Sequence, residues 1–179
     1  MNIFANNLIF LDVETPNHYN DAVSSLALYI LKPSGELIEE AYLVDPETFF
    51  DEFNIQLTNI DRQKVKGQPT FGQLWPKLAA YFDDAIVVAH NATFDIGVLR
   101  KCLKRYGFID PFHRYMCTYR LYRKYYQFPS YRLNKLCAYL DIPLDTHHDA
   151  LCDTKACFEL FMHLVSDVTL KENDIYYCR

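Results

Sequence analysis

Four acidic residues in three separate parts of the chain have the chemistry to bind a metal ion. Asp12 and Glu14 close an apolar run, Asp95 follows a second apolar run, and Asp153 lies inside an apolar helical pattern. Four carboxylates at one point repel one another strongly unless positive charge lies between them. Hard divalent cations prefer such oxygen ligands. The acids therefore predict a metal site, provided that the fold brings them together.

The first two acids share a face if they lie in a strand. Side chains two residues apart in a strand point to the same side, so Asp12 and Glu14 would project together, with Val13 turned into the fold. Taken singly, each acid has an ordinary structural explanation. Asp12 could accept a turn or cap hydrogen bond, Asp95 could be a first-turn helix acid, and Asp153 could be a solvated helix residue. Only the set of acids favours a metal site.

The hydrophobic patterns predict one α/β domain that positions these acids. Strands are expected over residues 7–12, 21–31, 36–44, 84–89 and 112–117, and helices over 47–53, 61–66, 70–82, 93–106, 118–126, 132–140 and 148–165. Short turns between the first three strands predict an antiparallel meander, and the helix between the last two predicts parallel pairing. The expected fold is a mixed five-stranded sheet with helices on both faces.

The acids belong to three motifs that follow one another along the chain: Asp12-Val13-Glu14-Thr15, His90 to Asp95 and His148 to Asp153. Two shorter motif segments lie at 54–58 and 131–136. Over roughly residues 7–166, this pattern resembles the DEDDh branch of the 3′–5′ exonucleases, the superfamily of the DNA polymerase III epsilon proofreading subunit. The resemblance implies a ribonuclease H-like exonuclease domain over 1–166, with 167–179 as a short C-terminal tail.

The resemblance also implies roles for individual residues. Asp12, Glu14, Asp95 and Asp153 would hold two Mg²⁺ or Mn²⁺ ions, one to generate and orient the attacking hydroxide and one to stabilise the leaving oxyanion. His148 would be the general base, and a nucleoside 5′-monophosphate would leave from a 3′ end. On a regular helix, however, Asp149 shares a face with Asp153 better than His148 does. His148 must therefore lie at or before the helix start; otherwise His147 and Asp149 are the alternatives, and Asp149 also fits a first-turn helix acid.

Residues beside the acids are expected to contact the terminal nucleotide. Thr15, Asn91 and Phe94 are the candidates; Asn91, with His90, could instead satisfy loop backbone groups, and for Phe94 the sequence favours packing in the core over stacking on a base. Pro16 stands where many relatives of the resembled family carry glycine. Because proline has no N–H, any contact from a backbone donor to the nucleotide at this position is lost.

A basic segment offers a second, electrostatic contact with a polyanion. The net charge is −5, but residues 100–135 carry a net +9 and the remainder −14. Arg120 and Arg123 are the predicted phosphate contacts; the alternative is a pair of solvated basic helices. Four tyrosines at helical spacing favour a buried stripe: Tyr115, Tyr119, Tyr122 and Tyr126. Three rings around a Pro-Ser turn are expected to stack on unpaired bases: Tyr125, Phe128 and Tyr131.

The length and composition of the chain exclude several other classes of protein and site. The 179 residues suit one domain, the longest uncharged apolar stretch is far too short for a membrane helix, and no signal-peptide pattern opens the chain, so a cytoplasmic location is expected. Six cysteines without a Cys-x-x-Cys pair predict neither a disulfide framework nor a zinc site.

The leading interpretation is a stand-alone exonuclease on single-stranded 3′ ends, DNA more than RNA. The alternatives are a proofreading subunit of a replicative polymerase and a catalytically silent nucleic-acid-binding protein. A homodimer stays open.

Overall fold

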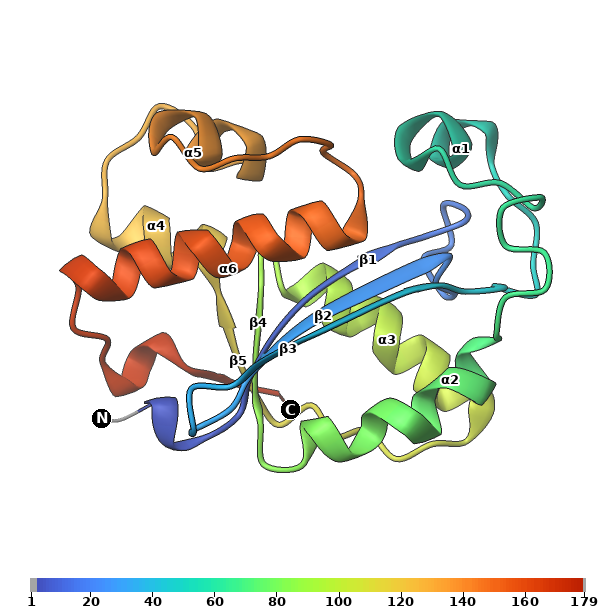
Figure 1. The fold of residues 1–179 in the computed structure, drawn as a ribbon, viewed down its shortest axis with the longest axis horizontal. Helices are drawn as coiled ribbons and strands as arrows, with labels where there is room; N and C mark the ends of the chain where they lie inside the picture. The colour runs from blue at the N-terminus through green and yellow to red at the C-terminus, as the bar shows by residue number, and fades with distance from the viewer. Residues whose placement is uncertain (1–2, 179) are drawn as a thin grey trace.

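The computed structural model describes residues 3–178, which form a six-stranded mixed sheet between two layers of helices (Figure 1). The strands are β1 Leu8–Glu14, β2 Ser25–Leu31, β3 Leu37–Leu43, β4 Ile86–Ala89, β5 Arg114–Cys117 and β6 Tyr176–Tyr177. The helices are α1 Glu52–Thr58, α2 Phe71–Leu78, α3 Thr93–Tyr106, α4 Thr118–Tyr125, α5 Leu133–Tyr139 and α6 Ala150–Asp167. Short 3-10 helices lie at Ile3–Ala5, Ala79–Phe82 and Glu172–Asp174.

The sheet has the predicted mixed topology, in the order β3-β2-β1-β4-β5-β6. The first three strands form an antiparallel meander, and β4 pairs in parallel with both β1 and β5. The predicted α/β class is confirmed, but the predicted count of five strands is wrong by one. The sixth strand pairs Tyr176 with Tyr115 of β5, and a two-residue strand is too short to produce a recognisable alternation in the sequence.

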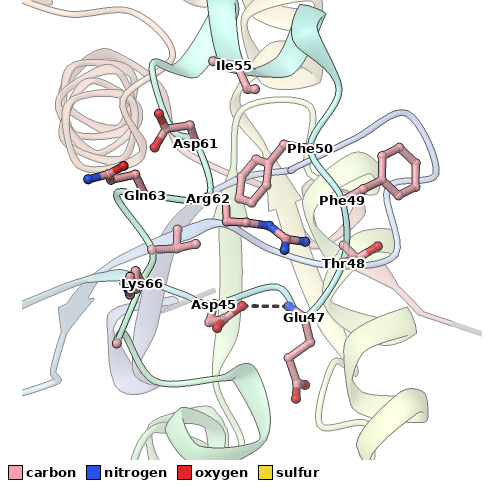
Figure 2. A pocket seen from close by; sticks show the side chains of 12 residues that line it. Asp45, Glu47, Thr48, Phe49, Phe50, Ile55, Asp61, Arg62, Gln63 and Lys66 are labelled. Carbon is pink, nitrogen blue, oxygen red and sulfur yellow. Dashed lines mark hydrogen bonds between the residues drawn. The ribbon is translucent and has the colours of Figure 1, made fainter.

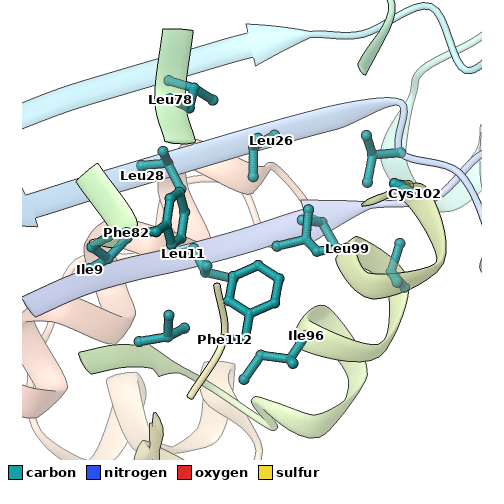
Figure 3. Close-up of a cluster of buried hydrophobic side chains, with 14 of the residues drawn as sticks. Ile9, Leu11, Leu26, Leu28, Leu78, Phe82, Ile96, Leu99, Cys102 and Phe112 are labelled. Carbon is teal, nitrogen blue, oxygen red and sulfur yellow. The ribbon is translucent and has the colours of Figure 1, made fainter. Parts of the chain in front are cut away.

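Strand β1 separates two hydrophobic cores. Ile9, Leu11 and Val13 pack towards α2 and α3, in the cluster that Figure 3 shows around Leu99 and Phe112. The alternate residues Leu8 and Phe10 pack instead with residues of α4, α5 and α6. Because side chains alternate along a strand, Asp12 and Glu14 continue the face that looks towards α6. Val13 is buried in the opposite core, as predicted.

Two predicted helices are wrong, and both errors lie in the connection between β3 and α2. Residues 47–53 are mostly irregular, since Glu47 takes a left-handed φ of 52° and α1 begins only at Glu52. Residues 61–66 form turns, in which the carboxylate of Asp61 accepts a hydrogen bond from the backbone N–H of Lys64 at 2.8 Å. Local side-chain bonding of this kind offers the backbone an alternative to a helix.

The residues beyond α6 pack back onto the domain. Asp174 is buried, and its carboxylate binds Nζ of Lys124 at 2.6 Å and the hydroxyl of Tyr125 at 2.6 Å. The predicted division at residue 166 stays a prediction. Among the described residues, no helix combines the length and the apolar character that crossing a membrane requires.

Candidate active site

Three of the four predicted acids meet at the end of β1. Asp12 and Glu14 project from this strand, and Asp153 lies in the first turn of α6, which packs across the same face. One carboxylate oxygen from each of the three lies within 4.8 Å of the others. Glu14 and Asp153 are buried, and Asp12 is half-buried. The fold therefore places three carboxylates within reach of one cation.

Asp95 joins this group from the first turn of α3. Its side chain is 2% exposed, and its Oδ1 accepts a hydrogen bond from the backbone N–H of Val13 at 3.3 Å. Val13 lies between the first two acids in β1, so this bond holds Asp95 beside them. Among the neighbouring charges, that of Asp95 has the largest effect on Asp12.

All four acids have raised pKa values. Burial is the main cause for each, and the negative charges of the neighbouring acids add to it for Asp12, Glu14 and Asp95. The pKa of Glu14 rises to about 8, and those of Asp12, Asp95 and Asp153 also lie above their usual range. Within residues 3–178, no lysine or arginine forms an ion pair with any of them. Such a set of oxygen donors fits a hard divalent cation, which would supply the missing positive charge.

Two adjacent histidines precede α6. Nδ1 of His147 lies 3.0 Å from a carboxylate oxygen of Asp153, whereas His148 binds the same carboxylate through its backbone N–H at 3.1 Å. The two imidazole rings stack with centroids 3.9 Å apart. His148 has a φ of 67° and lies before the helix start, which is the placement that its predicted role requires. Asp149 is the N-cap of α6, and its carboxylate accepts two backbone hydrogen bonds there.

A cavity of about 830 Å³ opens over the acids and both histidines. The predicted substrate residues Thr15, Asn91 and Phe94 line it. Phe94 is 40% exposed, so the packing in the core that the sequence favoured for it is wrong. Lining residues that were not predicted include Asn54, Leu57, Tyr119, Arg132 and Asn134. Four of them lie in the two shorter motif segments at 54–58 and 131–136, and these segments are the signal in the sequence that could have identified them.

His90 is a structural residue of this site. Its Nδ1 lies 2.9 Å from the hydroxyl of Thr118, and its Nε2 lies 3.0 Å from the carbonyl oxygen of Tyr131. Burial lowers the pKa of His90 to about 4, so the ring is neutral and joins β4, α4 and the loop before α5. The alternative given for His90, a residue that satisfies loop groups, is the one that the geometry supports. Asn91 next to it is exposed at the cavity, with a φ of 67°.

The predicted phosphate contacts Arg120 and Arg123 do not line the cavity. The guanidinium of Arg120 lies 4.8 Å from the ring centroid of Tyr176, and that of Arg123 lies 5.7 Å from that of Tyr119. Four bases of the basic segment are neutralised by ion pairs, which reduces the predicted basic face: Arg100 with Asp110, Arg105 with Glu47, Arg114 with Asp84, and Lys124 with Asp174. Both arginines remain candidates for contacts further along a bound strand.

The aromatic rings that were expected to stack on bases contact other residues of the protein instead. Phe128 stacks on Tyr139 with an interplanar angle of 7°, and the hydroxyl of Tyr131 donates to the carbonyl of Tyr126 at 3.0 Å. Tyr125 donates to the buried Asp174. Of the predicted buried stripe, Tyr122 is buried, but Tyr115 lies in β5. Packing between α4, α5 and the C-terminal segment explains these rings, and the prediction of exposed stacking platforms is wrong.

A second cavity, of about 940 Å³, lies beside α1 and is lined by Ile55 of this helix (Figure 2). Its lining mixes the acids Asp45, Glu47 and Asp61 with the bases Arg62 and Lys66. The carboxylate of Asp45 already accepts a hydrogen bond from the backbone N–H of Glu47 at 3.0 Å. This second cavity therefore lacks the set of converging acids that makes the first cavity fit a divalent cation.

A ribonuclease H-like sheet with buried carboxylates at the end of β1 and histidines before the last helix defines a class of nucleases. The sequence of residues 9–161 matches the RNase_T family, described as exonuclease. The chain belongs to this exonuclease family, which confirms the DEDDh resemblance drawn from the sequence.

The similar sequences are parts of larger proteins. The PolC-type DNA polymerase III of Halalkalibacterium halodurans is 34% identical over 94% of this chain, and that of Clostridium perfringens is 32% identical over 88%. The chain spans only 12% and 11% of the lengths of these relatives. The sequence similarity therefore concerns one segment of each polymerase.

Solved exonuclease structures share the fold. Exonuclease X in complex with 5′ overhanging duplex DNA superposes with a TM-score of 0.73, covering 93% of this chain and 96% of its own, at 21% identity. Exonuclease I of E. coli in complex with a dT13 oligonucleotide superposes with a TM-score of 0.74, covering 91% of this chain and 41% of its own, at 17% identity. At these identities the comparison establishes the fold.

Proposed function

We propose that this chain is a metal-dependent 3′–5′ exonuclease that removes nucleoside 5′-monophosphates from single-stranded 3′ ends, preferring DNA to RNA. The observation that carries the proposal is the convergence of Asp12, Glu14 and Asp153 within 4.8 Å, with Asp95 held beside them through Val13. This cluster lies in the floor of a cavity large enough for a nucleotide. The family membership adds the reaction class.

The four acids would hold two Mg²⁺ or Mn²⁺ ions. When bound, such ions lower the pKa of a coordinated water and stabilise negative charge on the leaving oxygen. The raised pKa values of the acids support this assignment, because an arrangement so unfavourable for four free carboxylates becomes favourable around cations. Val13 N–H and the backbone N–H of His148 each bind one of the carboxylates and so fix their orientations.

His148 would take the proton from the attacking water. His148 lines the cavity, and its ring forms no hydrogen bond with the four carboxylates, whereas Nδ1 of His147 already faces Asp153. Burial and the neighbouring His147 lower the pKa of His148, so its imidazole is neutral near pH 7 and able to accept a proton. Thr15, Asn91 and Phe94 would contact the terminal nucleotide, with Phe94 offering an exposed ring to a base.

A 5′-labelled strand tests the direction and mode of attack. A 3′–5′ exonuclease shortens such a strand stepwise, producing a ladder whose bands descend with time, for DNA faster than for RNA. Release of the labelled 5′ nucleotide first, or early appearance of a few internal fragments, would contradict the proposal. A substrate with a blocked duplex 3′ end serves as the control for the requirement for a single strand.

A second candidate is the proofreading activity of a replicative polymerase, in association with a polymerase subunit. The similarity to segments of PolC-type polymerases favours it. Preferential removal of a mismatched 3′ nucleotide during synthesis by an added polymerase would distinguish proofreading from a stand-alone activity. The third alternative, a silent nucleic-acid-binding protein, is disfavoured because all four acids and His148 are present. Homodimer formation and a cytoplasmic location stay predictions.

A further inference from the structure

Asn54 is a nearly buried polar side chain for which the proposed reaction has no role. It lies on α1, is 8% exposed, and lines the cavity above the acids. Its Nδ2 donates to the carbonyl oxygen of Thr15 at 2.9 Å and to the hydroxyl oxygen of Thr15 at 3.2 Å. These two bonds attach α1 to the residue that follows Glu14 in the chain.

The hydrogen-bond directions fix the orientation of the Asn54 amide. The hydroxyl of Thr15 donates to Oδ1 of Asn20 at 3.0 Å, so its oxygen is left to accept from Asn54. Asn20 in turn donates through Nδ2 to the carbonyl of His18. A carbonyl oxygen can only accept, and Thr15 O faces the same Nδ2. Exchanging the oxygen and nitrogen of Asn54 would therefore place its amide oxygen against two acceptors.

The amide oxygen Oδ1 of Asn54 is left without a partner. Among residues 3–178 no hydrogen bond to this atom is present, although no buried side-chain oxygen or nitrogen in that range lacks a partner. The atom must therefore reach open space, and the open space beside Asn54 is the cavity. A fixed acceptor at the edge of a cavity, on a side chain that is otherwise buried, selects for a hydrogen-bond donor on a ligand.

The neighbouring backbone holds this acceptor in place. The carbonyl of Pro16 accepts from the backbone N–H of Asp51, the N-cap residue of α1, at 2.9 Å. The carboxylate of Asp51 binds the backbone N–H of His18 at 2.9 Å. The loop that lacks an N–H at Pro16 is thus joined to the start of α1 at residues 16 and 18, and Asn54 cannot turn away from Thr15 without losing its two hydrogen bonds.

We infer that Oδ1 of Asn54 accepts a hydrogen bond from a sugar hydroxyl of the 3′-terminal nucleotide and makes Asn54 a specificity-determining residue. The inference rests on the proposed function. Asn54 binds Thr15, and Thr15 follows the metal-ligand candidate Glu14 directly, about 3.8 Å away between Cα atoms. The sugar is the part of the terminal nucleotide that is attached to the scissile phosphate, so its hydroxyls are the donors nearest to this end of β1.

Three oligonucleotides that differ only in the terminal sugar test this inference. They end in a 2′-deoxynucleotide, a 2′,3′-dideoxynucleotide or a ribonucleotide, and kcat/KM is measured for each. Wild type is expected to prefer the 3′-hydroxyl end over the dideoxy end by about 3- to 10-fold, the effect of one neutral hydrogen bond. In Asn54→Leu, which keeps the approximate shape, this ratio falls to about one. In Asn54→Gln, which keeps an amide donor for Thr15 and an acceptor oxygen, the preference persists.

Gln56→Leu is the matched control, since Gln56 lies on the same helix, is exposed, and bonds only to Glu52. It should keep the wild-type ratio, and thermal unfolding verifies that each variant is folded. A ratio unchanged in Asn54→Leu, or a shift that follows the terminal base instead of the sugar, would overturn the inference. A larger response to the ribonucleotide end would assign the bond to the 2′-hydroxyl. If wild type releases no nucleotide from any of the three, the proposed function itself fails.

Discussion

His147 places Nδ1 3.0 Å from a carboxylate oxygen of Asp153, so its ring is committed to an acid that we assign as a metal ligand. The next residue, His148, reaches the same carboxylate only with its backbone N–H. The two histidines are adjacent and stacked, yet their positions give them different duties. Both line the cavity, and we propose that His147 orients the acid whereas His148 acts as the general base.

Replacing the two histidines separately tests this division. His148→Ala should lower kcat by about 100- to 10,000-fold, the usual contribution of a general base, with the apparent metal affinity unchanged. His147→Ala should instead weaken metal binding by about 10- to 100-fold, because it removes the partner of a ligand. Metal titrations of activity separate the effects. A greater loss of kcat in His147→Ala at saturating metal would exchange the assignments.

Neutralising one acid should have opposite effects with and without metal. In EDTA, Asp12→Asn removes an acid that is repelled by its acidic neighbours. A resulting gain of about 1 kcal/mol in the free energy of unfolding would raise the thermal midpoint by about 2 to 4 °C. With Mg²⁺ or Mn²⁺, the wild type should gain stability and Asp12→Asn should gain little. Differential scanning fluorimetry measures both. An exposed acid away from the site, as in Glu159→Gln, is the control; equal stabilisation of all three proteins by metal would contradict the site.

The metal-free protein should lose stability as the pH rises. Glu14 has a pKa of about 8 in the fold against an ordinary 4.5, so between these values the folded state binds more protons than the unfolded state. The free energy of unfolding then falls with increasing pH. His90, whose pKa is lowered from 6.5 to about 4, acts in the opposite sense below 6.5. The clearest window is therefore between 6.5 and about 8, where unfolding in EDTA should show the decline and saturating metal should remove it.

The positive charge of Arg132 in the cavity should make the binding of a nucleic-acid strand more sensitive to salt concentration. Arg132 lines the cavity and is exposed, so Arg132→Ala should reduce the slope of log Kd against log salt by about 0.7 for a single strand. Arg62→Ala, in the second cavity, should leave the slope unchanged. Arg120→Ala and Arg123→Ala measure whether these predicted residues meet phosphates further along the strand. Binding is measured with EDTA present, so that cleavage does not interfere.

The sequence predicted the structure best where residues able to do chemistry lie beside regular hydrophobic patterns. The apolar runs located β1, β4 and α3, and the motif order identified the acids, because these features depend on local alternation and on residue type. The sequence limited the start of the last helix to a few residues but did not locate it at Ala150, because this start depends on the capping carboxylate of Asp149. Asn54 and Arg132 could be noticed as parts of short motifs, but their place at the cavity depends on contacts between segments far apart in the chain.

The aromatic segment was misjudged for a related reason. Rings such as Tyr125 and Phe128 lie close to a turn, and a sequence cannot show whether another element covers them. In the structure, α5 and the C-terminal residues provide that cover, through Tyr139 and Asp174. The sixth strand escaped detection because β6 is too short to carry a pattern and is stabilised by pairing with β5.

The release of nucleotides from a 3′-labelled single strand tests the central claim most directly. Wild type and Asp12→Ala are incubated with labelled DNA or RNA in Mg²⁺, Mn²⁺ or EDTA, and the products are separated by chromatography. The acid cluster predicts labelled nucleoside 5′-monophosphate from wild type with either metal, and none in EDTA or from Asp12→Ala. Undiminished release in EDTA, or equal release by Asp12→Ala, would contradict it.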